Sequence, residues 1–359
     1  MTRILRTLSL LAVLPLLIAS ARSVAAPPSS SLRAFFIDVE GGQATLFITP
    51  TGQSLLIDTG WPGNNGRDAD RIVAAAKSAG LSRIDYVLIT HFHDDHVGGV
   101  PQLISRIPVG AFIDHGQNRE LDHGVTEHGF SEYQKVLATG NYKHITAKPG
   151  DTLPITGIKA TVISADGNVL PQPLPGAGQT NAICNQTSPS AADETENSRS
   201  LGILMEFGSL KILDLGDLTK DKERQLVCPV NRIGHVDILV VSHHGWYQSS
   251  SPEFVDALRA RVAIMDNGAT KGGSTPTLKT LRGAPGLETL WQVHFSEEGG
   301  QAFNTNDQFI ANLTKPDAGN DIELTANKDG SFDVENSRNK FLQHYTPAQQ
   351  PTVTASAAR

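Results

Sequence analysis

The residues best suited to chemistry lie at positions 91–96, where the chain reads His-Phe-His-Asp-Asp-His. Side chains alternate along an extended chain, so His91 and His93 are expected to point to one side. A turn after them would let Asp95 and His96 face the same cavity. Imidazole and carboxylate ligands together suit zinc, and also iron or manganese. Because short histidine-rich tracts favour metal binding over a plain polar loop, we expect a metal site here.

Two similar runs of elements lead to this cluster and to a second histidine motif. Apolar periodicity and turn residues predict the first run as strands and one helix, at 32–39, 44–48, 54–57, 68–79 (helix) and 84–90. The second run comprises 201–207, 211–215, 220–226 (helix) and 236–242, followed by a helix at 252–258 and a strand at 262–265. A further hairpin is expected at 323–326 and 332–335. Both histidine motifs therefore follow buried strands of an α/β chain.

The string at 91–96 resembles the HxHxDH signature of the metallo-β-lactamase superfamily, and other family features follow in order. By resemblance, Asp58 supports the metal loop, and Asp217 is the aspartate that bridges two metals. The stretch 242–245, Ser-His-His-Gly, resembles the last histidine motif. The resemblance covers residues 33–295 and implies a four-layer αββα sandwich that acts as a hydrolase through a metal-bound water.

Within the superfamily the chain is most similar to the ComEC-type branch of competence DNA-uptake proteins. The similarity rests on Asp-Val-Glu-Gly-Gly at 38–42, Asn-Ser-Arg-Ser at 197–200 and the His-His-Gly triplet. The chain departs from the branch at 40–43, where the branch usually has Gly-Gln-Gly-Asp, and at Trp246, where it usually has serine. Both departures concern the substrate rather than the metal.

The resemblance implies two metals per chain, zinc first, with iron or manganese as alternatives. His91 and His93 would hold one metal, and Asp95, His96, Asp217 and one histidine of the last pair would hold the other. Many family members carry a further histidine before the bridging aspartate, but no histidine lies between positions 144 and 235 here. A third ligand for the first metal is therefore open, and the candidates are His115, Asn197 or a water.

The last pair needs an assignment of its own. His243 directly follows the expected strand, so we expect it to be the metal ligand. His244 would then contact the substrate or donate a proton, and Asp95 would orient the attacking water or accept its proton. The expected catalytic residues are therefore Asp95 and His244.

The ends of the chain are expected to lie outside the fold. Basic residues, an apolar run and small residues follow one another within residues 1–25, which is typical of a signal peptide. We therefore expect a secreted or periplasmic protein with no membrane span after cleavage. The catalytic domain should occupy 32–340, with a Pro/Gly-rich loop insertion at 166–198 and a flexible tail at 341–359. The sequence does not define an oligomeric state.

Charge narrows the substrate. The chain carries 30 Lys and Arg against 37 Asp and Glu, and loss of residues 1–25 would remove three arginines and no acid. An acidic protein of this kind is not expected to bind nucleic acid strongly. A small-molecule or phosphodiester substrate is expected, with a β-lactam or lactone hydrolase as one alternative. A catalytically silent metal-binding or ligand-binding envelope protein is the other.

The two cysteines, Cys184 and Cys228, do not form a CxxC motif, so a thiolate metal site is not expected. Export makes a disulfide possible. A bond would tie the loop insertion to the segment that follows Asp217. Two buried thiols are the alternative, and we favour the disulfide.

Overall fold

The structure of the protein is a computed structural model that describes residues 30–120, 124–314 and 318–348. Its first large sheet contains, in spatial order, β19 (Leu342–Tyr345), β18 (Phe332–Asn336), β17 (Ile322–Ala326), β1 (Leu32–Phe36), β2 (Thr45–Ile48), β3 (Ser54–Ile57), β4 (Ile84–Leu88), β5 (Val109–Asp114) and β6 (Lys143–Thr146). The second contains β16 (Ile310–Asn312), β15 (Thr289–His294), β14 (Val262–Met265), β13 (Ile238–Val240), β11 (Leu210–Asp214), β10 (Gly202–Phe207), β7 (Lys159–Ala165) and β8 (Asn168–Val169). The expected signal peptide at 1–25 lies outside the described residues.

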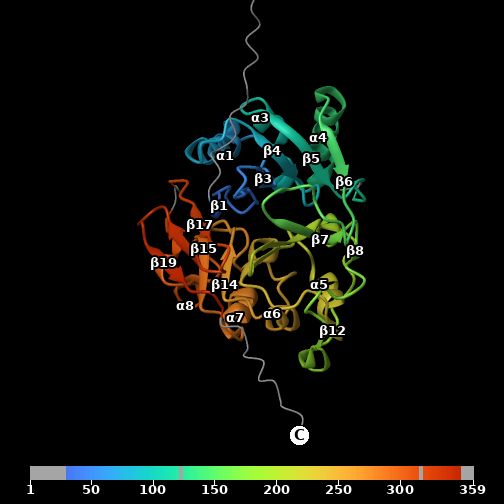
Figure 1. Ribbon diagram of the computed structural model, residues 1–359, viewed down its shortest axis with the longest axis vertical. Helices are drawn as coiled ribbons and strands as arrows, with labels where there is room; N and C mark the ends of the chain where they lie inside the picture. Colours follow the sequence, from blue (N-terminus) through green and yellow to red (C-terminus); the bar gives the residue numbers. More distant parts are fainter. Residues whose placement is uncertain (1–29, 121–123, 315–317, 349–359) are drawn as a thin grey trace, which may run out of the picture.

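Helices cover the outer face of each sheet. Ile72, Leu103 and Tyr133 come from α1 (Arg67–Ser78), α3 (Val100–Ile104) and α4 (Gly124–Gly140), and they form one buried cluster with the outer face of the first sheet. A separate cluster joins the second sheet to α5 (Lys220–Val227), α6 (Pro252–Leu258) and α7 (Thr275–Gly283). Figure 1 shows the first three helices at one end of the molecule and the other three at the opposite end, with the strands between them.

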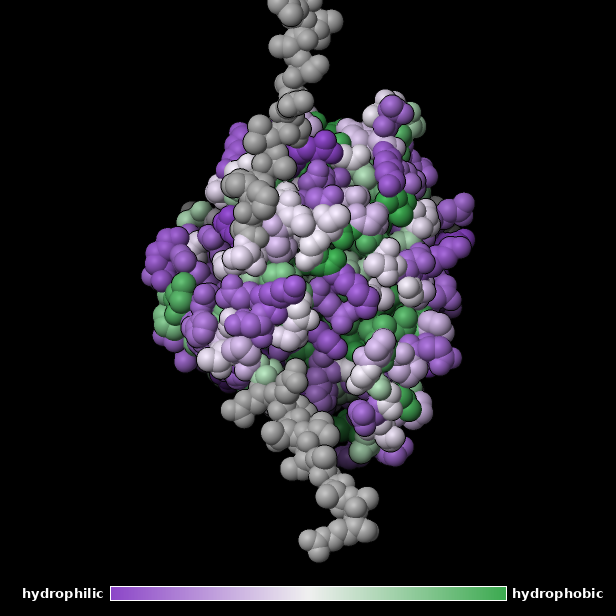
Figure 2. Space-filling view, in the orientation of Figure 1, coloured by the Kyte–Doolittle hydropathy of each residue, from purple (hydrophilic) through white to green (hydrophobic). Residues whose placement is uncertain are grey.

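The two sheets face each other across a third apolar cluster. Phe36 of β1, Val162 of β7 and Trp291 of β15 are all buried within it. Helix, sheet, sheet and helix therefore follow one another as layers, and the predicted four-layer αββα sandwich is confirmed. The face drawn in Figure 2 is a mosaic of hydrophilic and hydrophobic residues. Within the described residues, no helix is long and apolar enough to cross a membrane.

Parallel strands set the position of the site. Strands β3, β4 and β5 run parallel in the first sheet, and β11, β13, β14 and β15 run parallel in the second. In open α/β sheets, ligands bind in the crevice outside the carboxyl ends of such strands. Both histidine motifs follow strands of this kind, so the fold brings the two motifs to the same region.

The remaining helical elements are short. They are α2 (Asp94–Val97), α8 (Gly300–Phe303) and the 3₁₀ turns Asn64–Gly66, Ala182–Asn185, Glu196–Arg199, Ser242–Gly245 and Asp307–Phe309. The insertion at 166–198 contains two of these turns, β8, and β9 (Gln179–Thr180), which pairs with β12 (Val230–Asn231). A disulfide joins Cys184 to Cys228, as we expected, and so fastens this insertion to the end of α5.

The expected tail begins too early. Residues Leu342–Tyr345 form β19, which pairs with β18. Tyr345 is buried, stacks on Phe332 at 4.6 Å between ring centroids, and its hydroxyl accepts a hydrogen bond of 3.0 Å from Trp291 Nε1. The strand is short and lies at the sheet edge, where Leu342 is exposed, so no apolar alternation marks it in the sequence.

Candidate metal centre

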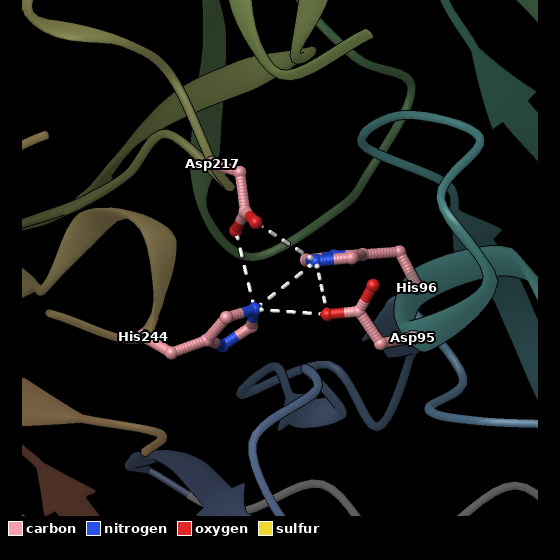
Figure 3. A group of neighbouring side chains, drawn as sticks. All are labelled: Asp95, His96, Asp217 and His244. Atoms are coloured by element: carbon pink, nitrogen blue, oxygen red, sulfur yellow. Dashed lines mark hydrogen bonds and ion pairs between the residues drawn. The ribbon is translucent and has the colours of Figure 1, made fainter. Parts of the chain in front are cut away.

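The predicted turn after His93 is the start of α2, which places Asp95 and His96 in its first turn. Asp95, His96, Asp217 and His244 converge from three separate segments, as Figure 3 shows. His96 Nε2 lies 3.2 Å from His244 Nε2, 3.3 Å from Asp95 Oδ2 and 3.3 Å from Asp217 Oδ2. His244 Nε2 lies 3.2 Å from Asp95 Oδ2 and 3.4 Å from Asp217 Oδ1.

These separations fit a bound cation. Ligand atoms about 2.0–2.1 Å from a tetrahedral zinc are about 3.3–3.4 Å from one another. The four residues offer two imidazole nitrogens and two carboxylates, a donor set that suits zinc, iron or manganese. All four are buried, and buried carboxylates require a positive partner. The residues present therefore fit a divalent metal.

Asp58 holds the outer side of His96. Asp58 Oδ2 lies 2.7 Å from His96 Nδ1 and accepts a hydrogen bond of 2.7 Å from the Thr90 hydroxyl, while Asp58 Oδ1 accepts one of 2.8 Å from the Thr90 amide. With Nδ1 occupied in this way, Nε2 of His96 is turned to the centre. This is the supporting position that the family resemblance implied for Asp58.

His91 lies beside this group with one free nitrogen. Its Nδ1 is 3.0 Å from the Thr90 hydroxyl and 3.5 Å from the Ser200 hydroxyl. Its Nε2 is buried, lies 4.0 Å from Asp217 Oδ2, and has no hydrogen-bond partner among the described residues. Burial, together with the neighbouring His96 and His93, lowers the pKa of His91 well below its usual value. This shift favours the neutral imidazole, the form that carries the lone pair a metal ligand needs.

His93 contacts a residue that the sequence analysis missed. Its Nε2 lies 3.2 Å from Oε2 of Glu120, and its ring meets the ring of His91 edge-on at 4.7 Å between centroids. Oε2 of Glu120 also accepts a hydrogen bond of 2.7 Å from the Glu196 amide. Glu120 lies in an irregular loop after β5 and belongs to no sequence motif, so its contact with His93 could not be predicted from the sequence.

His115 is not brought into the group. Phe92 points away from His91 and His93, and the His115 ring packs on Phe92 at 4.6 Å between centroids. His115 Nε2 lies 3.0 Å from Glu196 Oε2. His115, one of our three candidates for the open ligand position, therefore contacts Phe92 and Glu196 rather than the group.

The last histidine pair is arranged opposite to our expectation. His244, not His243, contributes Nε2 to the group of four, while His243 Nε2 lies 3.4 Å from Asp217 Oδ2. Both residues have left-handed backbone, with φ of 56° at His243 and 53° at His244. Strand β13 ends at Val240, so His243 does not directly follow a strand, as we had expected it to do. Both rings consequently face the same interior.

Asn197, our other candidate for the open ligand position, lies next to His243. Its Nδ2 is 3.5 Å from His243 Nε2. Its Oδ1 is buried and lacks a hydrogen-bond partner within the part of the chain that the structure describes. An unpartnered buried carbonyl oxygen beside Asp217 and His243 is suited to receive a metal or a water.

Charge at the site favours a cation. Burial opposes ionisation of Asp217, but His244, His96 and His243 hold its pKa well below the usual range. Burial also raises the pKa of Asp214 to about 7 and that of Asp266 well above its usual value. Asp214 accepts a hydrogen bond of 2.7 Å from Gln43 Nε2. Buried carboxylates therefore surround the site on several sides.

Comparison with known proteins supports the same class. A family model described as the metallo-beta-lactamase superfamily matches residues 38–178, which include Asp58 and the whole 91–96 cluster. Residues 38–178, less than half of the chain, therefore match a metallo-β-lactamase domain.

Individual relatives are more distant. The chain is 24% identical over 210 residues to ComE operon protein 3 of Bacillus subtilis, which belongs to the branch that the sequence resembles; the match covers 56% of this chain and 22% of the relative. It is 34% identical over 107 residues to a hydroxyacylglutathione hydrolase of Stenotrophomonas maltophilia, covering 30% of this chain and 37% of the relative. The chain thus spans well under half the length of either relative. Among solved structures, the metallo-beta-lactamase fold protein YhfI of Bacillus subtilis is similar with a TM-score of 0.46 and 12% identity, over 73% of this chain and 96% of that one.

Proposed function

We propose that this protein is a metal-dependent hydrolase that binds two divalent metals between its two sheets. The observation that carries the proposal is the convergence of Asp95, His96, Asp217 and His244, whose ligand atoms all lie within 4.8 Å of one another. The metallo-β-lactamase domain and the similarity to a hydroxyacylglutathione hydrolase support hydrolysis. Zinc is the first candidate metal, and iron or manganese is the alternative.

Two sets of residues would hold the metals. Asp95, His96, Asp217 and His244 form one set, and His244 takes the ligand position that we first gave to His243. His91 and His93 form the other set, shared through Asp217, and the Asn197 carbonyl oxygen, which lacks a partner among the described residues, is a candidate donor for it. When bound, such metals supply Lewis acidity and make a hydrolytic nucleophile available near neutral pH.

The protein supplies orientation. Asp58 contacts Nδ1 of His96 and leaves Nε2 of that ring for a metal. Glu120 contacts Nε2 of His93 and leaves Nδ1 of that ring for the other metal. Asp95 lies at the edge of the group, where it can orient the attacking water. His243 lines the adjacent cavity, and it replaces His244 as the imidazole that contacts the substrate.

The substrate that we propose is a phosphodiester or a related phosphate ester. The similarity to the competence branch supports it, and so does Lys271, which lines the cavity beside His244 and whose ammonium contacts Asp95. The acidic balance of the chain argues for a small ester rather than long nucleic acid. The hydroxyacylglutathione hydrolase relative favours a second candidate, an acyl substrate such as a lactone or β-lactam.

The test combines metal analysis with turnover of bis(p-nitrophenyl) phosphate. We expect one to two equivalents of zinc or iron per chain, and loss of turnover in His93→Ala and Asp217→Ala. His344→Ala is the matched control, because His344 is an exposed histidine on β19. A metal-free protein, or full activity in both site variants, contradicts the proposal. Turnover of a cephalosporin or lactone alone selects the acyl substrate, and metal binding without any turnover selects a silent binding protein.

We also propose that the protein is exported to the periplasm or secreted. The signal-peptide pattern in residues 1–25 supports export, and so does the Cys184–Cys228 disulfide, since such bonds persist in oxidising compartments. Expression of the full chain followed by fractionation and N-terminal sequencing tests it. A mature chain that begins near residue 26 in the periplasm or medium is expected, and an intact N-terminus in the cytosol contradicts export.

A further inference from the structure

A small cavity opens beside His244. It has a volume of about 170 Å³ and is lined by His243, His244, Trp246, Lys271 and Gly272. Pockets that enclose a drug-sized ligand have about 300–1,000 Å³, so this one takes a single group of a substrate. Because His244 belongs both to the cavity and to the proposed metal ligands, that group would lie next to the reacting centre.

The backbone of Lys271 is fixed against the histidine turn. Its carbonyl accepts a hydrogen bond of 2.8 Å from the Gly268 amide, and the Gly273 amide donates one of 2.8 Å to the His244 carbonyl. A Cβ atom on Gly272 would lie 2.1 Å from the His244 carbonyl oxygen, so the loop reaches the turn only because a glycine stands there. Lys271 is therefore a positioned residue rather than a solvated loop lysine.

The ammonium of Lys271 points into the site. Its Nζ donates a hydrogen bond of 2.8 Å to the Gly41 carbonyl, contacts Asp95 Oδ2, and lies 5.0 Å from the centroid of the Trp61 ring. The Trp61 contact holds the ammonium by a cation–π interaction. An ammonium has three donors, and its strongest partner here, Asp95, is a proposed metal ligand. An anionic group in the cavity would give the Lys271 ammonium a second anionic partner in addition to Asp95.

An aromatic pair forms the outer wall. The ring centroids of Trp246 and Tyr247 lie 5.5 Å apart, and Tyr247 is 51% exposed. Trp246 lines the small cavity, and Tyr247 lines a second one of about 350 Å³ together with Thr219, Lys220, Gln248 and residues 190–193 of the insertion. The pair therefore connects a space beside the metal site to a larger space under the insertion.

We propose that Lys271 binds the anionic group of the substrate and that the Trp246–Tyr247 pair stacks on a planar ring carried by the same molecule. The substrate class is thereby narrowed to phosphate esters with an aromatic or heterocyclic arm. Flat rings stack on exposed aromatic side chains whatever their ring substituents. The inference rests on the proposed function, because it places the phosphate beside the proposed metals.

Calorimetric binding to the metal-loaded protein tests the inference without requiring turnover. The probes are thymidine 5′-monophosphate, ribose 5-phosphate, which lacks the ring, and thymidine, which lacks the anion. We expect thymidine 5′-monophosphate to bind about tenfold or more tightly than either fragment. Tyr247→Ala should remove the preference over ribose 5-phosphate. Lys271→Gln should weaken both phosphates about tenfold with the metal content retained, and Lys271→Arg should restore part of the affinity.

Matched controls separate these effects from general destabilisation. Leu342→Ala removes another exposed large apolar side chain, and Lys159→Gln removes an exposed lysine on β7. Both controls should bind like the wild type. Equal affinity for thymidine 5′-monophosphate and ribose 5-phosphate overturns the ring subsite, and unaltered phosphate binding in Lys271→Gln overturns the anion contact. Ligand discrimination without hydrolysis contradicts only the proposed function, whereas hydrolysis without discrimination contradicts only this inference.

Discussion

Asp58 Oδ2 lies 2.7 Å from Nδ1 of His96, and this contact turns Nε2 of His96 toward Asp217 and His244. Both residues of the pair are buried, so the carboxylate cannot exchange the ring for water. The histidine ring is held in the orientation that a metal needs before any metal binds. Partners of this kind contribute to metal affinity although they do not touch the metal.

The first prediction concerns this pair. Asp58→Asn should lower metal affinity about 10–100-fold, because the His96 ring loses its charged partner. Competition with a chromogenic chelator measures the change. An Asp–His pair with the same separation of 2.7 Å lies exposed at Asp333 and His344, so Asp333→Asn is the matched control and should bind metal like the wild type. Equal metal affinity in both variants would show that Asp58 does not support the site.

The second prediction concerns Glu120. Glu120→Ala should weaken binding of the metal held by His91 and His93 about 10–100-fold, because the His93 ring loses the carboxylate that contacts its Nε2. Glu120→Gln keeps an acceptor and should lie between the two. The measurement is the number of metal equivalents that remain bound as the chelator concentration rises. In the variant, the equivalent held by His91 and His93 should be lost before the other one. Glu132→Ala removes an exposed glutamate of α4 and serves as control. Simultaneous loss of both equivalents would contradict the assignment.

The third prediction separates the two histidines of the last motif. His244→Ala should lose metal, since His244 Nε2 lies within the group of four. His243→Ala should retain at least the metal bound by that group and lose turnover, because His243 lines the cavity where the substrate binds. Metal analysis and hydrolysis on the same preparations distinguish the two. The reverse pattern would restore the order that the sequence alone had indicated.

The first cluster and its surroundings were predictable because their information is local. Residues 91–96 lie together in the chain, and a buried strand followed by a turn is enough to orient them. Asp58 and Asp217 could be matched through family motifs. The periodicity of apolar residues also predicted α1, α5, α6 and the strands that lead to the two histidine motifs, but it did not predict α4 or α7.

The features that were missed depend on long-range or unusual geometry. Two consecutive residues with left-handed backbone, His243 and His244, cannot be predicted from the position of the strand that precedes them. Glu120 meets His93 and the Glu196 amide only after the halves pack together. His115 had the right type and strand position, but its ring is directed to Phe92.

The last prediction concerns stability and pH at Glu223, a fully buried acid of α5. Its two oxygens accept hydrogen bonds of 2.9 Å from the Ser250 and Ser251 amides, and burial raises its pKa to about 7. The pKa of a glutamate in the unfolded chain is 4.5, so the native state binds more protons between pH 4.5 and 7, and stability falls as pH rises through that window.

The variant Glu223→Gln removes this titration and so tests the argument. The free energy of unfolding of the variant, relative to that of the wild type, should therefore rise by at most about 3 kcal/mol from pH 4.5 to 8, as measured by denaturant unfolding. Comparing the two proteins at each pH cancels the titration of Asp214 and Asp321, whose pKa values are also raised to about 7. A difference that stays constant across the range would mean that Glu223 ionises as readily in the native state as in the unfolded chain.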